Sequence, residues 1–159
     1  MEEYPWLPFI NIIKKLNMQQ QLIDVLKSSL PEEELSSNYY RSCEVYVISS
    51  DNNCYHLSKN TIIDFTIASV AIVKIEKQND RNILFTFLTN PEYRRQGYGE
   101  KLLICISEIY DNLKLYVRVS NEAAVNLYTK MNFKIVRRVS DFYNYTKTCE
   151  DAYEMLFVR

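Results

Sequence analysis

The sequence has few of the residues on which metal centres and disulfide frameworks depend. His56 is the one histidine, and the four cysteines, Cys43, Cys54, Cys105 and Cys149, are widely scattered without a C-x-x-C pair. Such spacing supports neither a zinc site nor a disulfide framework. We therefore expect no bound metal, and we interpret the cysteines as buried thiols.

An excess of one charge and long apolar runs are missing too. The formal net charge is −1, which argues against the basic surface of a nucleic-acid-binding domain or an anionic-membrane patch. No apolar run is as long as a membrane span, and the first five residues carry acids where a signal peptide carries bases. The 159 residues suit one domain, 1–159, with its own core. We expect a soluble, cytoplasmic protein that binds neither nucleic acid nor membrane.

Glycine is the third scarce residue, and its placement is informative. Both glycines, Gly97 and Gly99, lie in one short segment between a strand-like run, 83–89, and a helix-like run. Glycine is needed where the backbone bends sharply or approaches another group closely. A turn of this kind that enters a helix N-terminus suits an anion such as a phosphate. The alternative is a tight turn in which Arg94 and Arg95 are solvated surface charges.

Hydrophobic periodicity predicts the elements around this segment. The helix after Gly97 should bury one face, formed by Leu102, Leu103, Ile106, Ile109 and Tyr110. Further helices are predicted over 18–30, within 31–40 and over 122–131, with Ser120 or Asn121 as the cap of the last and Asn132 in the left-handed position after it. Further strands are predicted at 10–13, 45–48, 62–75, 113–119, 134–140 and 153–158.

Several motifs resemble those of the GNAT superfamily of N-acetyltransferases. Arg94-x-x-Gly97-x-Gly99 is similar to its pyrophosphate loop, and residues 119–133 are similar to its S-N-x-x-A-x-x-L-Y-x-x-x-G-F element. The tyrosine-rich run 142–145 and the segment 150–155 resemble the last hairpin and the E-D-A-x-x-M strand of protein N-terminal acetyltransferases. Residues 30–32 resemble their L-P-E turn. The resemblance covers roughly 10–159 and points to the branch that includes the RimI-type enzymes.

The resemblance implies an α/β (α+β) fold, a mixed, mostly antiparallel seven-stranded sheet flanked by about four helices. It also implies acetyl-CoA as co-substrate and direct acetyl transfer in a ternary complex. An auxiliary subunit is compatible with this branch. The residues that would bind the cofactor are Leu88, Thr89, Arg94, Arg95, Gln96, Gly97, Tyr98, Gly99, Asn121 and Tyr128.

The resemblance also assigns catalytic roles. Tyr128 would protonate the departing thiolate as general acid; on an amphipathic helix it could instead be a core tyrosine. The RimI-type L-E-V-R strand, whose Glu is a base, is here Leu-Tyr-Val-Arg, so Tyr116 replaces the carboxylate. Glu32 and Tyr116 are both candidate bases, although an acid at a helix start is commonly a solvated charge and an ordinary phenol is a weak base.

Substrate recognition is the last expectation. Tyr39, Tyr143 and Tyr145, together with Glu32, would hold the backbone of a peptide N-terminus. The leading hypothesis is therefore acetylation of the α-amino group of a protein or peptide. The alternatives are acetylation of lysine or small amines, and a catalytically silent acyl-CoA-binding module.

Overall fold

The computed structural model describes residues 43–57, 63–76, 81–144 and 149–159. One seven-stranded sheet runs through them in the order β2-β1-β3-β4-β5-β7-β6. The strands are β1 (Cys43–Ser49), β2 (Cys54–Leu57), β3 (Ile67–Glu76), β4 (Arg81–Thr89), β5 (Asn112–Arg118), β6 (Lys134–Val139) and β7 (Ala152–Val158). The helices are α3 (Tyr98–Ile109), α4 (Glu122–Lys130) and the 3-10 turn η2 (Pro91–Tyr93).

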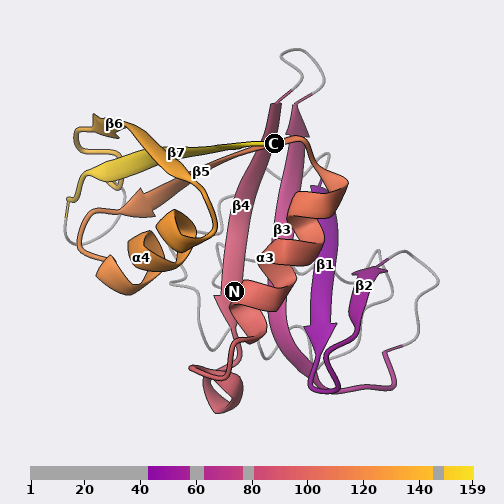
Figure 1. Cartoon of the computed structure of the whole chain (residues 1–159). Coiled ribbons are helices and arrows are strands. Elements are labelled where there is room, and N and C mark those ends of the chain that lie inside the picture. Colours follow the sequence, from indigo (N-terminus) through magenta and orange to yellow (C-terminus); the bar gives the residue numbers. More distant parts are fainter. Residues whose placement is uncertain (1–42, 58–62, 77–80, 145–148) are drawn as a thin grey trace, which may run out of the picture.

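The sheet divides between β4 and β5. Every other neighbouring pair of strands is antiparallel, whereas β4 and β5 run parallel and share one register pair, Ile83 with Lys114. Beyond that pair the two strands diverge, leaving a four-stranded part, β2-β1-β3-β4, and a three-stranded part, β5-β7-β6 (Figure 1). The split therefore leaves the β5-facing edge of β4 beyond Ile83 without a partner strand among the described residues.

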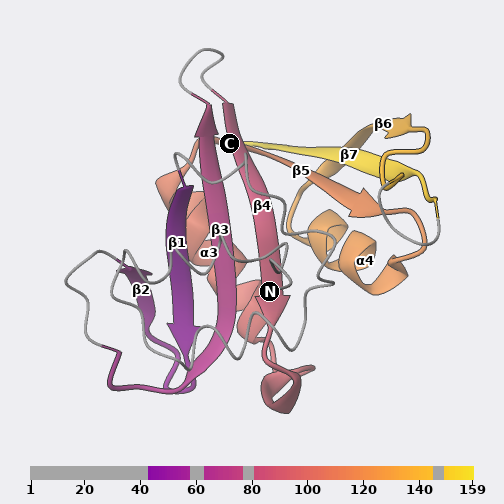
Figure 2. The same ribbon diagram turned by 180° about the vertical axis from the view of Figure 1, so that it is seen from behind.

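Each part of the sheet has its own helix. Seen from both sides, α3 lies on one face of the four-stranded part and α4 lies on the same side of the three-stranded part (Figures 1 and 2). The first seven residues of β3 are buried, as suits a strand in the middle of a sheet, while β5 alternates between buried and half-buried residues. The core joins both helices to the sheet through Leu102, Leu103, Ile106, Leu113, Leu115, Tyr128 and Met155.

The predicted fold class is confirmed, and most predicted elements have a counterpart. The strand predicted at 62–75 begins only at Ile67, and the short edge strand β2 was not predicted, because four residues are too few to give a clear strand pattern. Asn132 has a φ of 66°, which confirms its left-handed position. The strand at 10–13 and the helices at 18–30 and within 31–40 lie outside the described residues.

Ile109 does not lie on the buried face of α3, as its spacing suggested. Its side chain is 54% exposed, because Ile109 is the last residue of α3 and the chain continues in extended conformation at Tyr110. Tyr110 is buried, and its hydroxyl forms a hydrogen bond with the hydroxyl of Tyr46, with the two oxygens 2.8 Å apart. Helical spacing therefore does not predict burial correctly at Ile109, because the helix ends there and the backbone changes direction.

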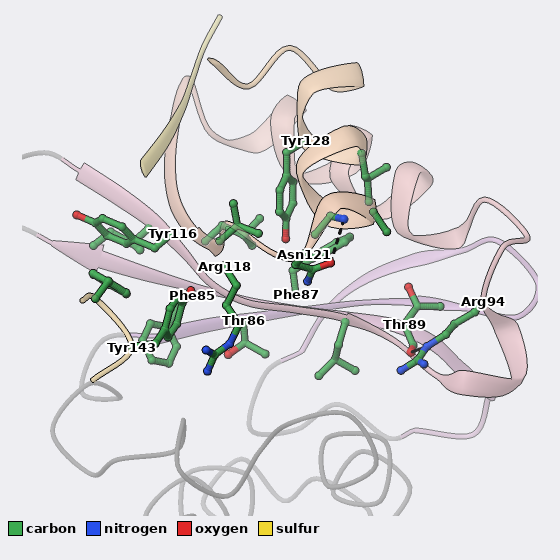
Figure 3. Close-up of a pocket in the computed structure, with 18 of the residues that line it drawn as sticks. Phe85, Thr86, Phe87, Thr89, Arg94, Tyr116, Arg118, Asn121, Tyr128 and Tyr143 are labelled. Carbon is green, nitrogen blue, oxygen red and sulfur yellow. Dashed lines mark hydrogen bonds between the residues drawn. The ribbon is translucent and has the colours of Figure 1, made fainter. Parts of the chain in front are cut away.

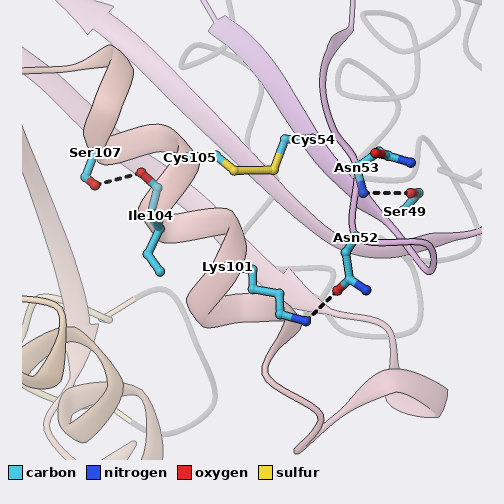
Figure 4. Close-up of a disulfide and its surroundings, with 8 residues drawn as sticks. All are labelled: Ser49, Asn52, Asn53, Cys54, Lys101, Ile104, Cys105 and Ser107. Atoms are coloured by element: carbon cyan, nitrogen blue, oxygen red, sulfur yellow. Dashed lines mark hydrogen bonds between the residues drawn. A yellow bond between two sulfur atoms is a disulfide. The ribbon is translucent and has the colours of Figure 1, made fainter.

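The interpretation of the cysteines as buried thiols was wrong. Cys54 and Cys105 form a disulfide with a Cα–Cα distance of 6.9 Å (Figure 4). Cys54 and Cys149 are exposed, and Cys43 and Cys105 are half-buried. The two bonded residues are 51 positions apart in the sequence, and only the packing of α3 beside the β1–β2 hairpin brings them together. Their spacing in the sequence therefore gave no sign of the bond.

The disulfide is one of three links along one face of α3. The hydroxyl of Tyr98 donates to the carbonyl oxygen of Ser50 at 2.7 Å, and Lys101 Nζ donates to Asn52 Oδ1 at 2.5 Å. Positions 98, 101 and 105 share one side of a helix, and their partners at 50, 52 and 54 are alternate residues of the hairpin. The hairpin therefore holds α3 from its first turn to its middle.

Loss of the disulfide should lower stability measurably. Cross-linking a loop of this length stabilises the folded state by about 4 kcal/mol in the chain-entropy model. We expect a reductant to lower the Tm of the protein by about 10 °C, measured by circular dichroism. In a Cys54→Ser variant the same reductant should cause no further change. An unchanged Tm of the unmutated protein after complete reduction would contradict this expectation.

Candidate active site

A pocket of about 770 Å³ lies in the split between β4 and β5 (Figure 3). It reaches from α4 on one side of the sheet to the segment that follows β6 on the other. The lining residues are Ile83 to Thr89 of β4, Arg94 and Arg95, Tyr116 to Arg118 of β5, Asn121, Ala123, Ala124, Leu127 and Tyr128 of the α4 segment, and Phe142 and Tyr143. The pocket therefore connects the two faces of the sheet.

The glycine segment forms one end of this region. Asn90 caps η2 by accepting from the Glu92 amide at 3.2 Å, and Gln96 Nε2 donates back to the Glu92 carbonyl oxygen at 3.2 Å. Arg94 Nε donates to the Thr89 carbonyl oxygen at 3.3 Å, which holds this arginine beside the end of β4. The segment is therefore an ordered turn whose two arginines line the pocket.

The two glycines serve different needs. Gly97 caps α3 with a φ of 83°, a left-handed conformation, and a Cβ there would meet nothing within 4 Å. At Gly99 a Cβ would lie 3.3 Å from side-chain atoms of both Phe87 and Thr89, so a larger residue would require these side chains to shift by a few tenths of an ångström. The Lys101 amide donates a hydrogen bond to the Gly97 carbonyl oxygen. The amides that come before Lys101 in α3 have no carbonyl oxygen of the helix to which they can donate. Such an N-terminus favours an anion.

Tyr128 projects into the middle of the pocket from α4. Asn121 caps this helix by accepting from the Ala124 amide at 3.2 Å, which confirms one of the two predicted caps. The Tyr128 ring packs against Phe87 and Phe133, with centroids 6.0 Å and 5.6 Å away. In Figure 3 its hydroxyl points toward β4, and no other described residue is hydrogen-bonded to it.

Burial sets the protonation state of Tyr128. The side chain is 7% exposed, and desolvation raises the pKa of the phenol well above its usual value of 10.0. The phenol therefore stays protonated at every physiological pH. A neutral hydroxyl that faces a pocket can donate a proton or a hydrogen bond to a group that gains negative charge.

Tyr116 lies at the other side of the pocket. Its ring stacks on that of Phe142, with centroids 4.5 Å apart, and in Figure 3 its hydroxyl points away from Tyr128. Across the β5–β7 pair it faces Glu154, whose carboxylate is bonded to Arg137 Nε at 2.6 Å. This ion pair is the main reason that the pKa of Arg137 is raised, and the Tyr116 phenol adds to it. Tyr116 therefore takes part in a surface cluster as well as in the pocket wall.

The structure brings together eight of the predicted site residues: Leu88, Thr89, Arg94, Arg95, Tyr116, Asn121, Tyr128 and Tyr143 all line the pocket. Gln96 to Gly99 adjoin it without lining it, and the Tyr98 side chain is bonded to the β1–β2 hairpin. Glu32, Tyr39 and Tyr145 lie outside the described residues. Their predicted roles remain predictions.

Some lining residues were not predicted. Thr86 and Phe87 belong to the part of β4 that pairs with β3 but, among the described strands, has no register partner on the side of β5. Arg118 and Phe142 both line the pocket because the segment after β6 returns over β5. The position of Arg118, alternate with Tyr116 on one strand, was the signal that could have found it.

The sequence matches the model of the Acetyltransferase (GNAT) family over residues 20–133. The chain therefore belongs to the GNAT family, in agreement with the split sheet and the glycine turn described above. Among curated proteins it is similar to N-alpha-acetyltransferase 50 of Danio rerio, with 31% identity over 87 residues, or 50% of this chain and 52% of the relative. The chain spans about half the length of this curated relative.

Two solved structures illustrate the range of similar folds. The ribosomal-protein-S18-alanine N-acetyltransferase from Escherichia coli is 31% identical, with a TM-score of 0.53 over 62% of this chain and 64% of that chain. Arabidopsis thaliana Naa50, solved with the bisubstrate analogue CoA-Ac-MVNAL, is 18% identical, with a TM-score of 0.64 over 87% of this chain and 91% of that chain. The second likeness shows the fold alone.

Proposed function

We propose that this protein is an acetyl-CoA-dependent N-acetyltransferase that acetylates the α-amino group of protein or peptide N-termini by direct transfer. The observation that carries the proposal is the position of Tyr128. Its protonated hydroxyl lies in a pocket that opens toward a helix N-terminus with two arginines and also toward the tyrosine-containing segment after β6. Membership of the GNAT family and the similarity to N-alpha-acetyltransferases support the same function.

The residues of the pocket fit acetyl-CoA. The N-terminus of α3, together with Arg94 and Arg95, would hold the pyrophosphate. Among the described strands, none pairs with the pocket side of β4 from Thr86 to Thr89, and this edge would offer backbone groups to the amides of the pantetheine arm. Once bound, acetyl-CoA supplies the thioester that donates the acetyl group.

The chemistry requires one proton to move from nitrogen to sulfur. The amine nitrogen forms the new C–N bond to the acetyl carbon while the C–S bond of the thioester breaks. Tyr128 donates its phenolic proton to the departing sulfur, and the proton released by the amine nitrogen returns to Tyr128 through solvent. The products are an N-acetyl group and a free thiol, so atoms and charges balance.

The lining favours an amine that is already neutral. No carboxylate is among the described residues that line the pocket, so the lining offers no strong base for a cationic ammonium group. An α-amine has a pKa of ~8 against ~10.4 for lysine, so its deprotonation at neutral pH costs roughly 3 kcal/mol less. A weak base or a water relay is then sufficient. Glu32 and Tyr116 remain the proposed candidates for that base.

Two peptides test this proposal. A short peptide with a free N-terminus should be acetylated on the order of 100-fold faster at pH 7 than the same peptide with a blocked N-terminus and an internal lysine, as the neutral fractions of the two amines predict. Labelled acetyl-CoA and mass spectrometry of the product give both rate and position. A third peptide, blocked and with the lysine replaced by arginine, sets the background. Equal rates on the first two peptides would favour the lysine or small-amine alternative.

A further inference from the structure

A row of stacked side chains lies over the pocket end of β5. Lys114, Tyr116 and Arg118 are alternate residues of this strand and project from one face. Phe142 stacks on Tyr116, and Tyr143 meets Phe142 edge-on with centroids 5.0 Å apart. At the end of the row, the guanidinium carbon of Arg118 lies 4.0 Å from the centroid of the Tyr143 ring. Contacts between these side chains therefore hold the segment after β6 against β5.

Arg118 is itself fixed by a carboxylate from the other end of that segment. Its Nη1 lies 3.3 Å from Glu150 Oε2, and Glu150 Oε1 accepts from the Ser120 amide at 2.8 Å. The hydrogen bonds from Ser120 are the largest cause of the lowered pKa of Glu150, and Arg118 lowers it further. The carboxylate is therefore ionised at neutral pH and holds both the guanidinium and the start of the α4 segment.

The two ends of the connection between β6 and β7 also bind each other. The Tyr143 amide donates to the Glu150 carbonyl oxygen at 3.0 Å. Tyr143 is 8% exposed and lines the pocket on the side opposite the glycine turn. The Arg118 side chain is 22% exposed. The flat face of its guanidinium group lies against the Tyr143 ring, and one edge of the group faces the Glu150 carboxylate.

We propose that Arg118 is a positioning residue for the amine substrate. The guanidinium holds the Tyr143 ring in the pocket wall, so it sets the affinity for the amine rather than the rate of acetyl transfer. This proposal rests on the proposed acetyltransferase function. Lysine cannot replace arginine in this role, because an ammonium group has no planar face to stack on the ring and no second donor edge for Glu150.

The test compares two arginines of the three-stranded part of the sheet, Arg118 of β5 and Arg138 of β6. Arg118→Lys should raise the KM for the peptide about tenfold, because the planar stack on the Tyr143 ring and the fixed donor edge toward Glu150 are lost together. The kcat and the KM for acetyl-CoA should stay within about twofold. The matched control is Arg138→Lys, because Arg138 pairs with Asp151 at 2.6 Å, one residue from Glu150, and does not line the pocket. This control should leave all three constants unchanged.

A double-mutant cycle shows whether Arg118 acts through the ring. In a Tyr143→Leu background, Arg118→Lys should cause less than a twofold further change in the KM for the peptide. The same effect with and without the Tyr143 ring would overturn the proposal. An increase in the KM for acetyl-CoA equal to that for the peptide would also overturn it.

A measurement without substrate separates this proposal from the proposed function. In Arg118→Lys the amide of Tyr143 should exchange hydrogen faster than in the unmutated protein, while the amides of α3 should exchange at unchanged rates. Unchanged exchange at Tyr143 would overturn the positioning role whatever the substrate is. A failure of the function would instead be seen in the unmutated protein, as absence of acetylation of any free peptide N-terminus.

Discussion

Tyr128→Phe is expected to lower kcat by about 10- to 1000-fold, the usual range for the loss of an acid catalyst. The affinity for acetyl-CoA should stay nearly unchanged, because the substitution keeps the ring that packs between Phe87 and Phe133 and removes only the hydroxyl. Steady-state kinetics with a peptide substrate and calorimetric titration of acetyl-CoA give the two quantities. Unaltered activity would mean that Tyr128 is a packing residue and that water protonates the thiolate.

The matched control for this variant is Tyr110→Phe. Tyr110 is also a buried tyrosine of the core, but its hydroxyl is bonded to that of Tyr46 and it does not line the pocket. Loss of the Tyr110 hydroxyl should change the free energy of unfolding and leave kcat unaltered.

The pH dependence of the unmutated enzyme gives a second check on Tyr128. Because burial raises the pKa of Tyr128 above 10.0, the acid form persists as pH rises through the usual range of a phenol. The rate should therefore not fall between pH 8 and pH 10 through loss of this proton. A fall with the ordinary phenol pKa would contradict the assignment of the buried Tyr128 as the acid.

Gly97→Asp is expected to weaken acetyl-CoA binding by on the order of 100-fold relative to Gly97→Asn. A carboxylate placed about 5 Å from a phosphate repels it by roughly 3 kcal/mol at an effective dielectric constant near 20. Position 97 offers open space for a side chain, so the substitution introduces no steric overlap. Calorimetric titration with acetyl-CoA measures the two affinities.

Asparagine is the matched control because aspartate and asparagine have the same shape and tolerate a left-handed backbone similarly well. The strain at a φ of 83° is thereby common to both variants, and their difference reports charge alone. Equal affinities of the two variants would show that no phosphate lies at this turn. Substitution at Gly99 is a poorer test, since a Cβ there makes tight contacts with the side chains of Phe87 and Thr89 and would add a packing effect to the effect of charge.

Local sequence signals predicted the parts of the site that depend on neighbouring residues. The glycine turn, the Asn121 cap and the left-handed Asn132 each follow from the chemistry of one or a few adjacent residues, and the structure places them as expected. The family class followed from motifs spread over the chain, and the family match agrees with it.

Features that depend on distant residues were not predicted. Cys54 and Cys105 are neighbours only because the hairpin packs along α3, and Arg118 meets Tyr143 only because the chain returns over β5. The orientation of the Tyr116 ring was not predicted either. The strand pattern determines only the face of the sheet on which Tyr116 lies, whereas stacking on Phe142 determines the direction of its ring. Register and three-dimensional packing decide these contacts, and no short pattern encodes them.

The strand order has a consequence for synthesis of the protein on the ribosome. The four-stranded part uses consecutive segments up to β4, so its strands can pair as soon as they emerge. The three-stranded part cannot, because β7 is made last and lies between β5 and β6. Until β7 has been synthesised, β6 lacks the one strand that pairs with it among the described elements, so its backbone hydrogen-bonding groups are open to other nascent chains. A ribosome that stalls before residue 152 would therefore release an aggregation-prone intermediate with an ordered first half.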